Sequence, residues 1–150
     1  MKRIHAAIAT LVTGLIVLGT TASYAQKKNA TVWPAEDIKW AEMKGAPPGV
    51  MYANLSGDIT KGAYAALIKL PAGLAHPLHT HSHDSKVVVI SGTFLYAPEG
   101  GKEVRLGPGS YLMVPGGVRH TSGVSADGPC EIYLEGPGMF DFHPAKAMKK

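Results

Sequence analysis

Residues 73–92 read GLAHPLHTHSHDSKVVVISG, and this stretch decides what kind of fold the chain can adopt. It holds four histidines, His76, His79, His81 and His83, followed by a run of β-branched residues. Histidines two positions apart on a strand point to the same face, so His79 and His81 are expected to present two imidazoles side by side. Because neutral imidazole is a ligand for divalent metals, the stretch predicts a strand and a metal site together.

The surrounding sequence is typical of short strands separated by glycine and proline, of which the chain has 18 and 11. No segment after residue 45 keeps a helical period for a dozen residues. These two features predict an all-β sandwich or barrel. Residues 33–40 are expected to form an edge strand or a short helical turn. The predicted strands are Ala63–Leu70, Leu78–His83, Lys86–Ile90, Thr93–Ala97, Glu103–Leu106, Tyr111–Val114 and Cys130–Leu134.

A further histidine of the same site is expected about forty residues along the chain. Residues 109–124 read GSYLMVPGGVRHTSGV, in which a Pro-Gly-Gly turn comes just before His120. From a different strand, His120 can close a third side of the site that His79 and His81 begin. The alternative is a set of solvent-exposed loop histidines that share no ligand.

The two stretches resemble the two motifs of the cupin superfamily. The first motif runs glycine, five residues, His-x-His, three or four residues, glutamate, six residues, glycine. The second runs glycine, five residues, Pro-x-Gly, two residues, histidine, three residues, asparagine. Both spacings from glycine to histidine match, from Gly73 to His79 and from Gly109 to His120, and the motifs span residues 73–124.

This resemblance implies a cupin-type double-stranded β-helix, or jelly-roll, barrel that forms a single domain over residues 26–150. It also implies that His79, His81 and His120 are metal ligands. The divalent ion would be zinc, iron, manganese or nickel, and the partner a small-molecule ligand. No residue is assigned a catalytic role, and no organic cofactor is expected.

The chain departs from the motifs at two positions. The ligand glutamate of the family falls at Ser85, and the asparagine falls at Val124. Three neutral imidazoles leave a divalent ion with its full +2 charge, which polarises a bound water strongly or attracts an anionic ligand. Whether Ser85, His83 or Asp84 replaces the glutamate stays open, as does a metal-free barrel. We expect His83 at the rim of the site and Asp84 in a solvated turn.

Other candidate residues are expected to have structural roles. His76 is expected off the ligand face, and Arg119 should point away from the metal by strand alternation. Cys130, the only cysteine, is expected to be a buried and inert thiol. Five residues on predicted strands are expected in the core rather than against a substrate. These are Tyr64, Tyr96, Tyr111, Tyr133 and Met113.

Residues 1–25 read as a secretory signal peptide. Lys2 and Arg3 precede the uncharged apolar stretch Ala6–Leu18, and small residues precede a cleavage point before Gln26. The apolar run is shorter than the ~20 residues that a spanning helix needs, which disfavours an uncleaved anchor. We therefore expect a bacterial protein exported to the periplasm or secreted, without a membrane part in its mature form.

The composition of residues 26–150 excludes some partners and leaves others open. This part carries 13 basic and 11 acidic residues, which leaves a net charge of +2. The basic residues are scattered and not interleaved with aromatic ones, so no nucleic-acid surface is expected. Trp33 and Trp40 are consistent with a homodimer contact through residues 32–40, and equally with packing over one barrel end.

Three classes of function fit the sequence, and the fold alone does not choose among them. The first is a metal-dependent enzyme: of dioxygenase type with iron, or a hydrolase or isomerase with zinc. The second is a non-catalytic barrel that binds or senses a metal or a small ligand. The third is a metal-free structural barrel that acts by dimerising.

Overall fold

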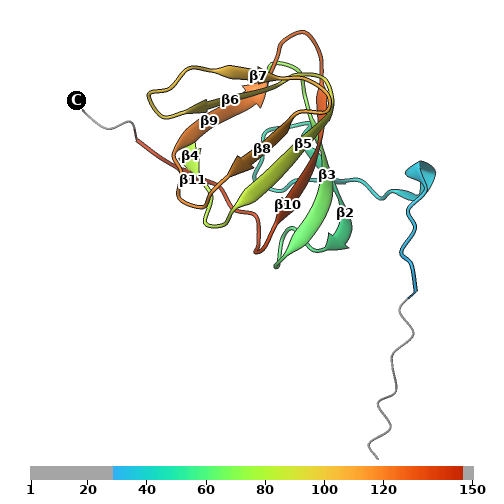
Figure 1. Cartoon of the computed structure of the whole chain (residues 1–150). Coiled ribbons are helices and arrows are strands. Elements are labelled where there is room, and N and C mark those ends of the chain that lie inside the picture. The colour runs from blue at the N-terminus through green and yellow to red at the C-terminus, as the bar shows by residue number, and fades with distance from the viewer. Residues whose placement is uncertain (1–28, 147–150) are drawn as a thin grey trace, which may run out of the picture. The chain divides into compact units, whose positions relative to one another are not determined.

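The computed structural model describes residues 29–146, and the fold in this range is almost entirely β (Figure 1). The only helix in these residues is the 3₁₀ turn η1 (Ala35–Asp37), so none is long and apolar enough to cross a membrane. The predicted signal peptide lies outside the described residues. The strands are β1 (Ala41–Glu42), β2 (Met51–Gly57), β3 (Tyr64–Leu70), β4 (Ala75–Thr80), β5 (Ser85–Ser91), β6 (Phe94–Pro98), β7 (Val104–Leu106), β8 (Tyr111–Val114), β9 (His120–Val124), β10 (Cys130–Gly136) and β11 (His143–Pro144).

These strands form two antiparallel sheets with a shared apolar core. The first sheet has the order β1-β2-β3-β10-β5-β8, and the second has the order β11-β4-β9-β6-β7. Alternate residues of β3 and β10 are buried, as period-two strands with one face on a core require. Tyr64, Ile68, Val89 and Ile132 are among the residues packed between the sheets. The all-β prediction is confirmed.

Most predicted strands appear within one or two residues of their expected bounds. The 3₁₀ turn η1 and the two-residue strand β1 account for the segment that the sequence left open. β2 and β9 were not delimited from the sequence, because each mixes polar residues and glycine. β9 pairs with β4 on one side and β6 on the other, so its strand conformation follows from tertiary pairing rather than from local propensity.

The bounds predicted for the histidine strand were wrong. β4 ends at Thr80 rather than at residue 83, because residues 81–84 leave the second sheet to enter β5 in the first. The turn at residues 115–117 supports this corner. The Gly117 amide donates to the His81 carbonyl at 2.8 Å, and the Gly116 amide donates to Asp84 Oδ1 at 2.9 Å.

Both tryptophans contact the barrel of their own chain. Trp33 Nε1 donates to the Leu55 carbonyl at 3.0 Å, and the Lys69 ammonium lies 3.8 Å from the centre of the Trp40 ring. Residues 32–42, which we call the N-terminal strap, thus lie against β2 and β3. Packing on one barrel is what the structure shows, and a homodimer through this segment stays a prediction.

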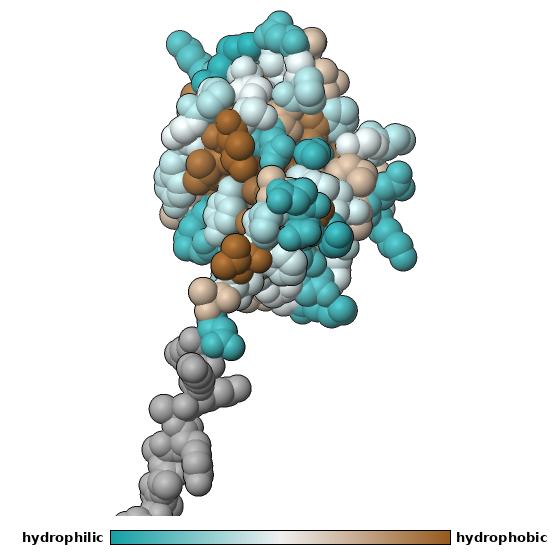
Figure 2. Space-filling view, turned by 90° about the vertical axis from the view of Figure 1, so that its right-hand side faces the viewer, coloured by the Kyte–Doolittle hydropathy of each residue, from teal (hydrophilic) through white to brown (hydrophobic). Residues whose placement is uncertain are grey.

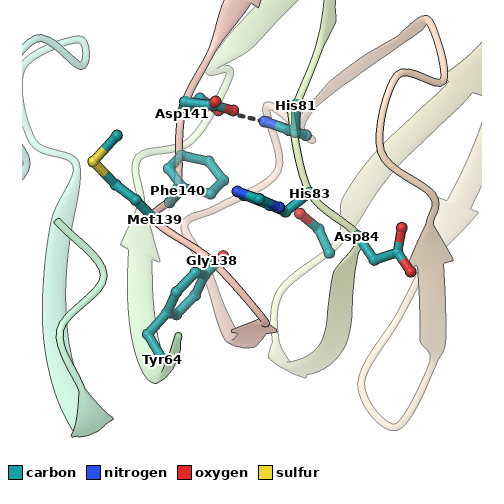
Figure 3. A pocket seen from close by; sticks show the side chains of 9 residues that line it. Tyr64, His81, His83, Asp84, Gly138, Met139, Phe140 and Asp141 are labelled. Carbon is teal, nitrogen blue, oxygen red and sulfur yellow. Dashed lines mark hydrogen bonds between the residues drawn. The ribbon is translucent and has the colours of Figure 1, made fainter. Parts of the chain in front are cut away.

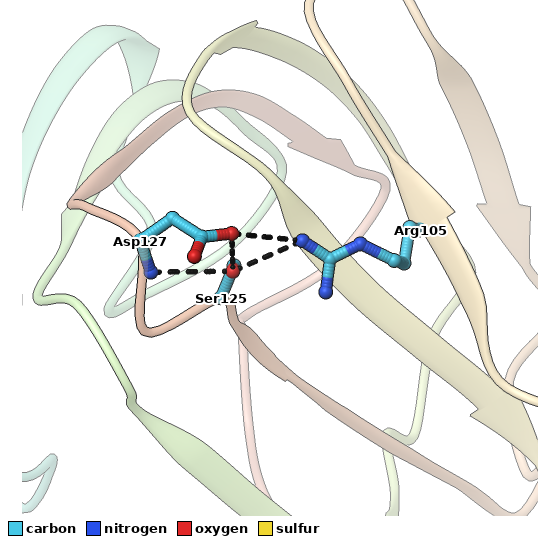
Figure 4. A network of polar contacts seen from close by, with 3 residues as sticks. All are labelled: Arg105, Ser125 and Asp127. Carbon is cyan, nitrogen blue, oxygen red and sulfur yellow. Dashed lines mark hydrogen bonds and ion pairs between the residues drawn. The ribbon is translucent and has the colours of Figure 1, made fainter.

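A polar network ties β7 to the end of β9 that lies away from His120 (Figure 4). Arg105 donates to Ser125 Oγ at 3.1 Å and to Asp127 Oδ2 at 3.0 Å, and the buried Ser125 hydroxyl also donates to Asp127. The Asp127 amide donates to Ser125 Oγ as well, so the serine hydroxyl lies at the centre of the network. We assign it a structural role at the edge of the second sheet.

The turn after β5 depends on a glycine. Gly92 has φ = 75°, and a Cβ there would lie 2.2 Å from the Pro129 carbonyl oxygen and 2.8 Å from the Cys130 Cα. Gly100 has a similar φ of 72°, but a Cβ there would meet nothing within 4 Å. A side chain at Gly100 would therefore meet backbone strain alone, whereas a side chain at Gly92 would meet backbone strain and steric overlap.

We predict that Gly92→Ala destabilises the protein much more than Gly100→Ala. Both changes carry the left-handed cost of about 1–2 kcal/mol. Gly92→Ala must also displace the start of β10, which adds a further cost of about 1–3 kcal/mol. Urea unfolding of the two variants measures the difference in free energy of unfolding. Equal losses would show that the backbone of residues 129–130 moves away freely.

Candidate metal centre

The three histidines predicted from the motifs lie together. His79 comes from β4, His81 follows that strand directly, and His120 begins β9. The ring centroids are 4.1 Å apart for His79 and His120, 4.9 Å for His79 and His81, and 5.3 Å for His81 and His120. One ligand nitrogen of each lies within 4.8 Å of the other two. Among the described residues, no other group of three histidine, cysteine or acidic side chains converges in this way.

The pairing of β4 with β9 contains an irregularity that shapes this cluster. His76 pairs with Ser122 and His79 pairs with His120, so three steps on β4 match two on β9. Pro77 lies in this interval, where its missing amide costs no ladder hydrogen bond. The extra residue turns His76 to the side of His79, with ring centroids 5.9 Å apart. The expectation that His76 lies off the ligand face was therefore wrong, although it is not one of the three converging residues.

Each of the three histidines is held by a backbone carbonyl at Nδ1. His79 Nδ1 donates to the Pro77 carbonyl at 2.7 Å, and His120 Nδ1 donates to the Val118 carbonyl at 2.9 Å. His81 Nδ1 donates to the Asp141 carbonyl at 2.5 Å. A carbonyl only accepts hydrogen bonds, so Nδ1 carries the proton and Nε2 carries the free lone pair in each neutral ring. This arrangement is typical of metal-ligating histidines, and the donor set fits a divalent ion.

The low exposure of the three rings to water keeps them neutral. Burial lowers the pKa of His79 from 6.5 to about 4, with a smaller effect from the neighbouring His120 and His81. Burial is also the main reason that the pKa values of His81 and His120 lie below the ordinary value. Rings in this state offer lone pairs rather than positive charges at neutral pH.

Hydroxyl groups occupy the region where the motif has its glutamate. Ser85 and Tyr64 are both 5% exposed and share a hydrogen bond. Burial raises the pKa of the Tyr64 phenol, which therefore stays protonated at neutral pH. Both residues line a narrow pocket together with His81 (Figure 3). The pocket thus presents neutral hydrogen-bond donors and acceptors beside the histidines instead of a carboxylate ligand.

His83 and Asp84 lie where the sequence analysis expected them. His83 is exposed, and its ring lies so close to Gly138 that a Cβ there would be 2.4 Å from Nε2 (Figure 3). Asp84 is exposed and accepts from the Gly116 amide, so its carboxylate serves the turn. Neither joins the three converging nitrogens.

A segment that sequence reasoning missed, residues 137–144, packs against this cluster. The Phe142 ring stacks on His79 with centroids 4.3 Å apart and an interplanar angle of 20°. The Phe140 ring lies 4.9 Å from His81. β11 then pairs with the histidine strand, with His143 opposite Thr80. The alternation Phe-Asp-Phe-His at residues 140–143 is a strand-like signal that could have pointed to this segment.

The Asp141 side chain fixes the segment to the corner after β4. Its carboxylate accepts from the Ser82 amide at 2.8 Å and pairs with His143 Nε2 at 2.9 Å. The backbone carbonyl of the same residue holds His81. One residue therefore couples the position of the C-terminal segment to the orientation of the His81 ring.

The residues expected in the core divide into three groups. Tyr64 is buried beside the site, and the Tyr96 ring lies 5.5 Å from His120, so both border the histidines. Tyr111 and Met113 are exposed, and the core prediction was wrong for them. They occupy the outward positions of β8, which has one face toward the core. Tyr133 points outward from β10 and is only partly buried.

Two further expectations are confirmed. Cys130 is buried, and burial raises the pKa of its thiol to about 11, which makes it inert at neutral pH. Arg119 pairs with Glu99 through Nε and Oε2 at 2.5 Å rather than turning toward the histidines.

Comparison with known proteins places the chain in a family. Residues 22–143 match a family described as Domain of unknown function (DUF4437). The chain belongs to the DUF4437 family. This DUF4437 protein is 33% identical over 114 residues to the dimethylsulfoniopropionate lyase DddQ of Ruegeria pomeroyi, a match that covers 69% of the chain. The chain spans 57% of the length of that curated relative.

Solved structures confirm the cupin fold of this DUF4437 protein. The crystal structure of DddQ from Ruegeria pomeroyi aligns with a TM-score of 0.55 and 24% identity, covering 69% of this chain and 57% of DddQ. An RmlC-like cupin protein from Ralstonia eutropha aligns with a TM-score of 0.65 and 22% identity, covering 80% of this chain and 76% of its own. KdgF from Halomonas sp. aligns with a TM-score of 0.58 and 23% identity, covering 73% and 94%. These likenesses show that the chain has the cupin fold.

We predict that the metal-free protein loses stability as the pH falls from 6.5 toward 4. The pKa of His79 is about 4 in the fold against 6.5 for the free side chain, so the unfolded chain binds the proton first. The contribution of neutral His79 to the free energy of unfolding is fully present above pH 6.5. It is lost as the pH falls, and the loss reaches about 3 kcal/mol once the pH is below both pKa values. Urea unfolding at a series of pH values measures this, with His79→Gln as the comparison. An equal slope in the variant would assign the effect to other groups.

We also predict that Ser85→Glu tightens the binding of a divalent metal by about tenfold, because a carboxylate adds an anionic ligand beside three neutral ones. Asp84→Asn serves as the matched control, since the Asp84 carboxylate serves the turn and should leave metal affinity unchanged. Calorimetric titration of zinc into metal-free protein measures both, with circular dichroism as a check on folding. Weaker binding in Asp84→Asn would instead make Asp84 the replacement for the glutamate.

Proposed function

We propose that this protein is a metal-dependent enzyme that acts on a small, carboxylate-bearing molecule at His79, His81 and His120. The observation that carries the proposal is the set of three neutral rings, two of them buried and His81 half-buried, whose Nδ1 atoms all donate to carbonyls. A divalent ion there would keep its full charge and would polarise an oxygen atom of the substrate or of water.

The side chains around the cluster supply the rest of a binding site. Carbonyl hydrogen bonds fix the three rings, so little reorganisation is needed when a ligand binds. Phe140 and Phe142 limit the access of water to the rings. The protonated Tyr64 phenol and its partner Ser85 can donate hydrogen bonds to an anionic oxygen beside His81.

Elimination is our first candidate reaction. Its support is the likeness to DddQ, whose name describes a lyase of dimethylsulfoniopropionate, a molecule that carries a carboxylate. In such a reaction a general base takes the proton from the carbon next to the carboxylate, a double bond forms to the following carbon, and the group on that carbon departs with the electron pair of its bond. Positive charge near the carboxylate favours this step because negative charge develops there.

An oxygen-dependent reaction of dioxygenase type is our second candidate. It is favoured by the all-histidine donor set, since no carboxylate lies in the converging group among residues 29–146. The resemblance to three-histidine cupin dioxygenases points the same way. The alternative to both reactions is a role in binding or sensing without turnover.

We further propose that the protein is exported, with residues 1–25 removed, and works in the periplasm or outside the cell. The charged start, apolar stretch and small-residue cleavage point support this. N-terminal sequencing of protein from whole cells and from the periplasmic fraction tests it. An intact N-terminus in all fractions would contradict export.

The metal assignment is tested by replacing each histidine. We predict that His79→Ala, His81→Ala and His120→Ala each lose most of the bound divalent metal and all turnover. His76→Ala is the matched control, because this ring lies beside His79 but outside the converging group, and it should keep the metal. Elemental analysis of untagged protein measures the metal content.

The reaction class is tested on the loaded protein. Product formation from dimethylsulfoniopropionate and related carboxylates without oxygen supports elimination, and oxygen uptake with a chelating substrate supports the second candidate. Wild-type metal content in all three alanine variants would overturn the site. Metal binding without turnover in either assay would leave the binding or sensing function.

A further inference from the structure

The outer face of the first sheet carries large apolar side chains that the barrel does not use. On β5 and β8 these are Val88, Ile90, Tyr111 and Met113, with exposed fractions of 36%, 45%, 60% and 46%. The same strands bury Val87 and Val89 on their inner side. Figure 2 shows that hydrophobic residues also form patches on the surface that faces the viewer. An exposed cluster of this kind on a sheet face marks an interaction surface.

Strand register extends this cluster into an ordered row. Tyr133 pairs with Leu67 on one side and with Val88 on the other, and Val88 pairs with Tyr111. Paired residues of adjacent strands point to the same face. The row thus crosses β3, β10, β5 and β8 without a charged residue.

The neighbouring row on the same face is charged at its centre. It runs from Ala65 through Glu135 and Lys86 to Met113. Lys86 and Glu135 pair within the chain at 2.9 Å. Along this row a small side chain is followed by a negative one, a positive one and a large apolar one.

The face is also hollowed where its side chains are small. A groove of about 520 Å³ lies over this part of the sheet. Its lining includes Ser56, Ala63, Ala65, Lys86 and Glu135. The large side chains of β8 at one side of the face are thus matched by a groove at β3 on the other side.

We propose that this four-strand face is the interface of a symmetric homodimer. The two-fold axis would run parallel to the strands, between β10 and β5. Such an axis places β10 of one copy over β5 of the other, and β8 over β3. The same patch then serves both subunits, as an isologous contact requires.

This symmetry makes the face complementary to itself in charge. Glu135 of each copy lies opposite Lys86 of the other, so two intermolecular ion pairs form across the axis. A two-fold axis perpendicular to the strands and passing over Tyr133 would instead set Glu135 over Glu131, because both lie on the outward side of β10. Opposite charges across an interface favour one orientation and penalise the other.

The same symmetry makes the face complementary in shape. Met113 of one copy meets the groove at Ala63 and Ala65 of the other, and Tyr133 meets Val88. The N-terminal strap beyond β3 and the sheet edge at β8 bound the contact on its two sides. Two twisted sheets pack face to face in this way at about 10 Å. The proposal is independent of the chemistry at the histidines, which lie in the interior of the barrel.

The first experiment is sedimentation velocity of the protein over a range of concentrations. We expect a dimer in the wild type, and an increase of at least about tenfold in the dimer dissociation constant for Val88→Glu and Tyr111→Asp. Val104→Glu is the matched control, because Val104 is an exposed residue on an edge strand of the other sheet. A wild-type monomer at every concentration would overturn the proposal, as would a dimer that only Val104→Glu disrupts.

The second experiment separates the interface from any role of the ion pair within one chain. The Lys86→Glu chain carries two glutamates at these positions, and the Glu135→Lys chain carries two lysines, so each should repel its own copy. Each variant is therefore expected to be monomeric alone, and an equimolar mixture is expected to form a one-to-one heterodimer, measured by native mass spectrometry. Dimers that remain equally tight in each variant alone, or a mixture that stays monomeric, would overturn the proposed axis.

Discussion

The antiparallel pairing of β4 with β9 is the interaction on which the candidate metal centre depends. It sets His79 directly opposite His120, and its irregularity at Pro77 turns His76 to the same side. Carbonyls at Pro77 and Val118 then take the Nδ1 protons, so the free lone pairs converge. A regular ladder would send one of these rings to the opposite face, since side chains alternate along a strand.

The third ring depends on parts of the chain that are far apart in sequence. His81 lies beyond the end of β4, where the chain crosses to the other sheet, and its orientation comes from the Asp141 carbonyl. The C-terminal segment that supplies this carbonyl also lays Phe142 over His79. The C-terminal segment thus orients the His81 ring and covers the His79 ring, whereas His79 and His120 take their orientation from the Pro77 and Val118 carbonyls.

The substitution of serine for the motif glutamate changes the electrostatics of the centre rather than its framework. Ser85 is buried and bonded to Tyr64, so the position is filled by a neutral pair that lines the pocket beside His81. The charge of a bound ion would then be left for the substrate to neutralise.

Strand alternation lets the first sheet form the core on one face and carry exposed apolar residues on the other. β5 packs Val87 and Val89 inward, while Val88 and Ile90 face outward.

The sequence by itself determined the all-β class, most strand bounds and the identity of the three histidines. Period-two alternation and the spacing of glycines around histidines are local properties, so they can be read from the chain. Only the tertiary structure decided the position of His76, the role of residues 137–144 and the exposure of Tyr111 and Met113. A bulge, a carbonyl partner sixty residues away and the open face of an edge strand depend on how distant strands pair, and local pattern carries no information about that pairing.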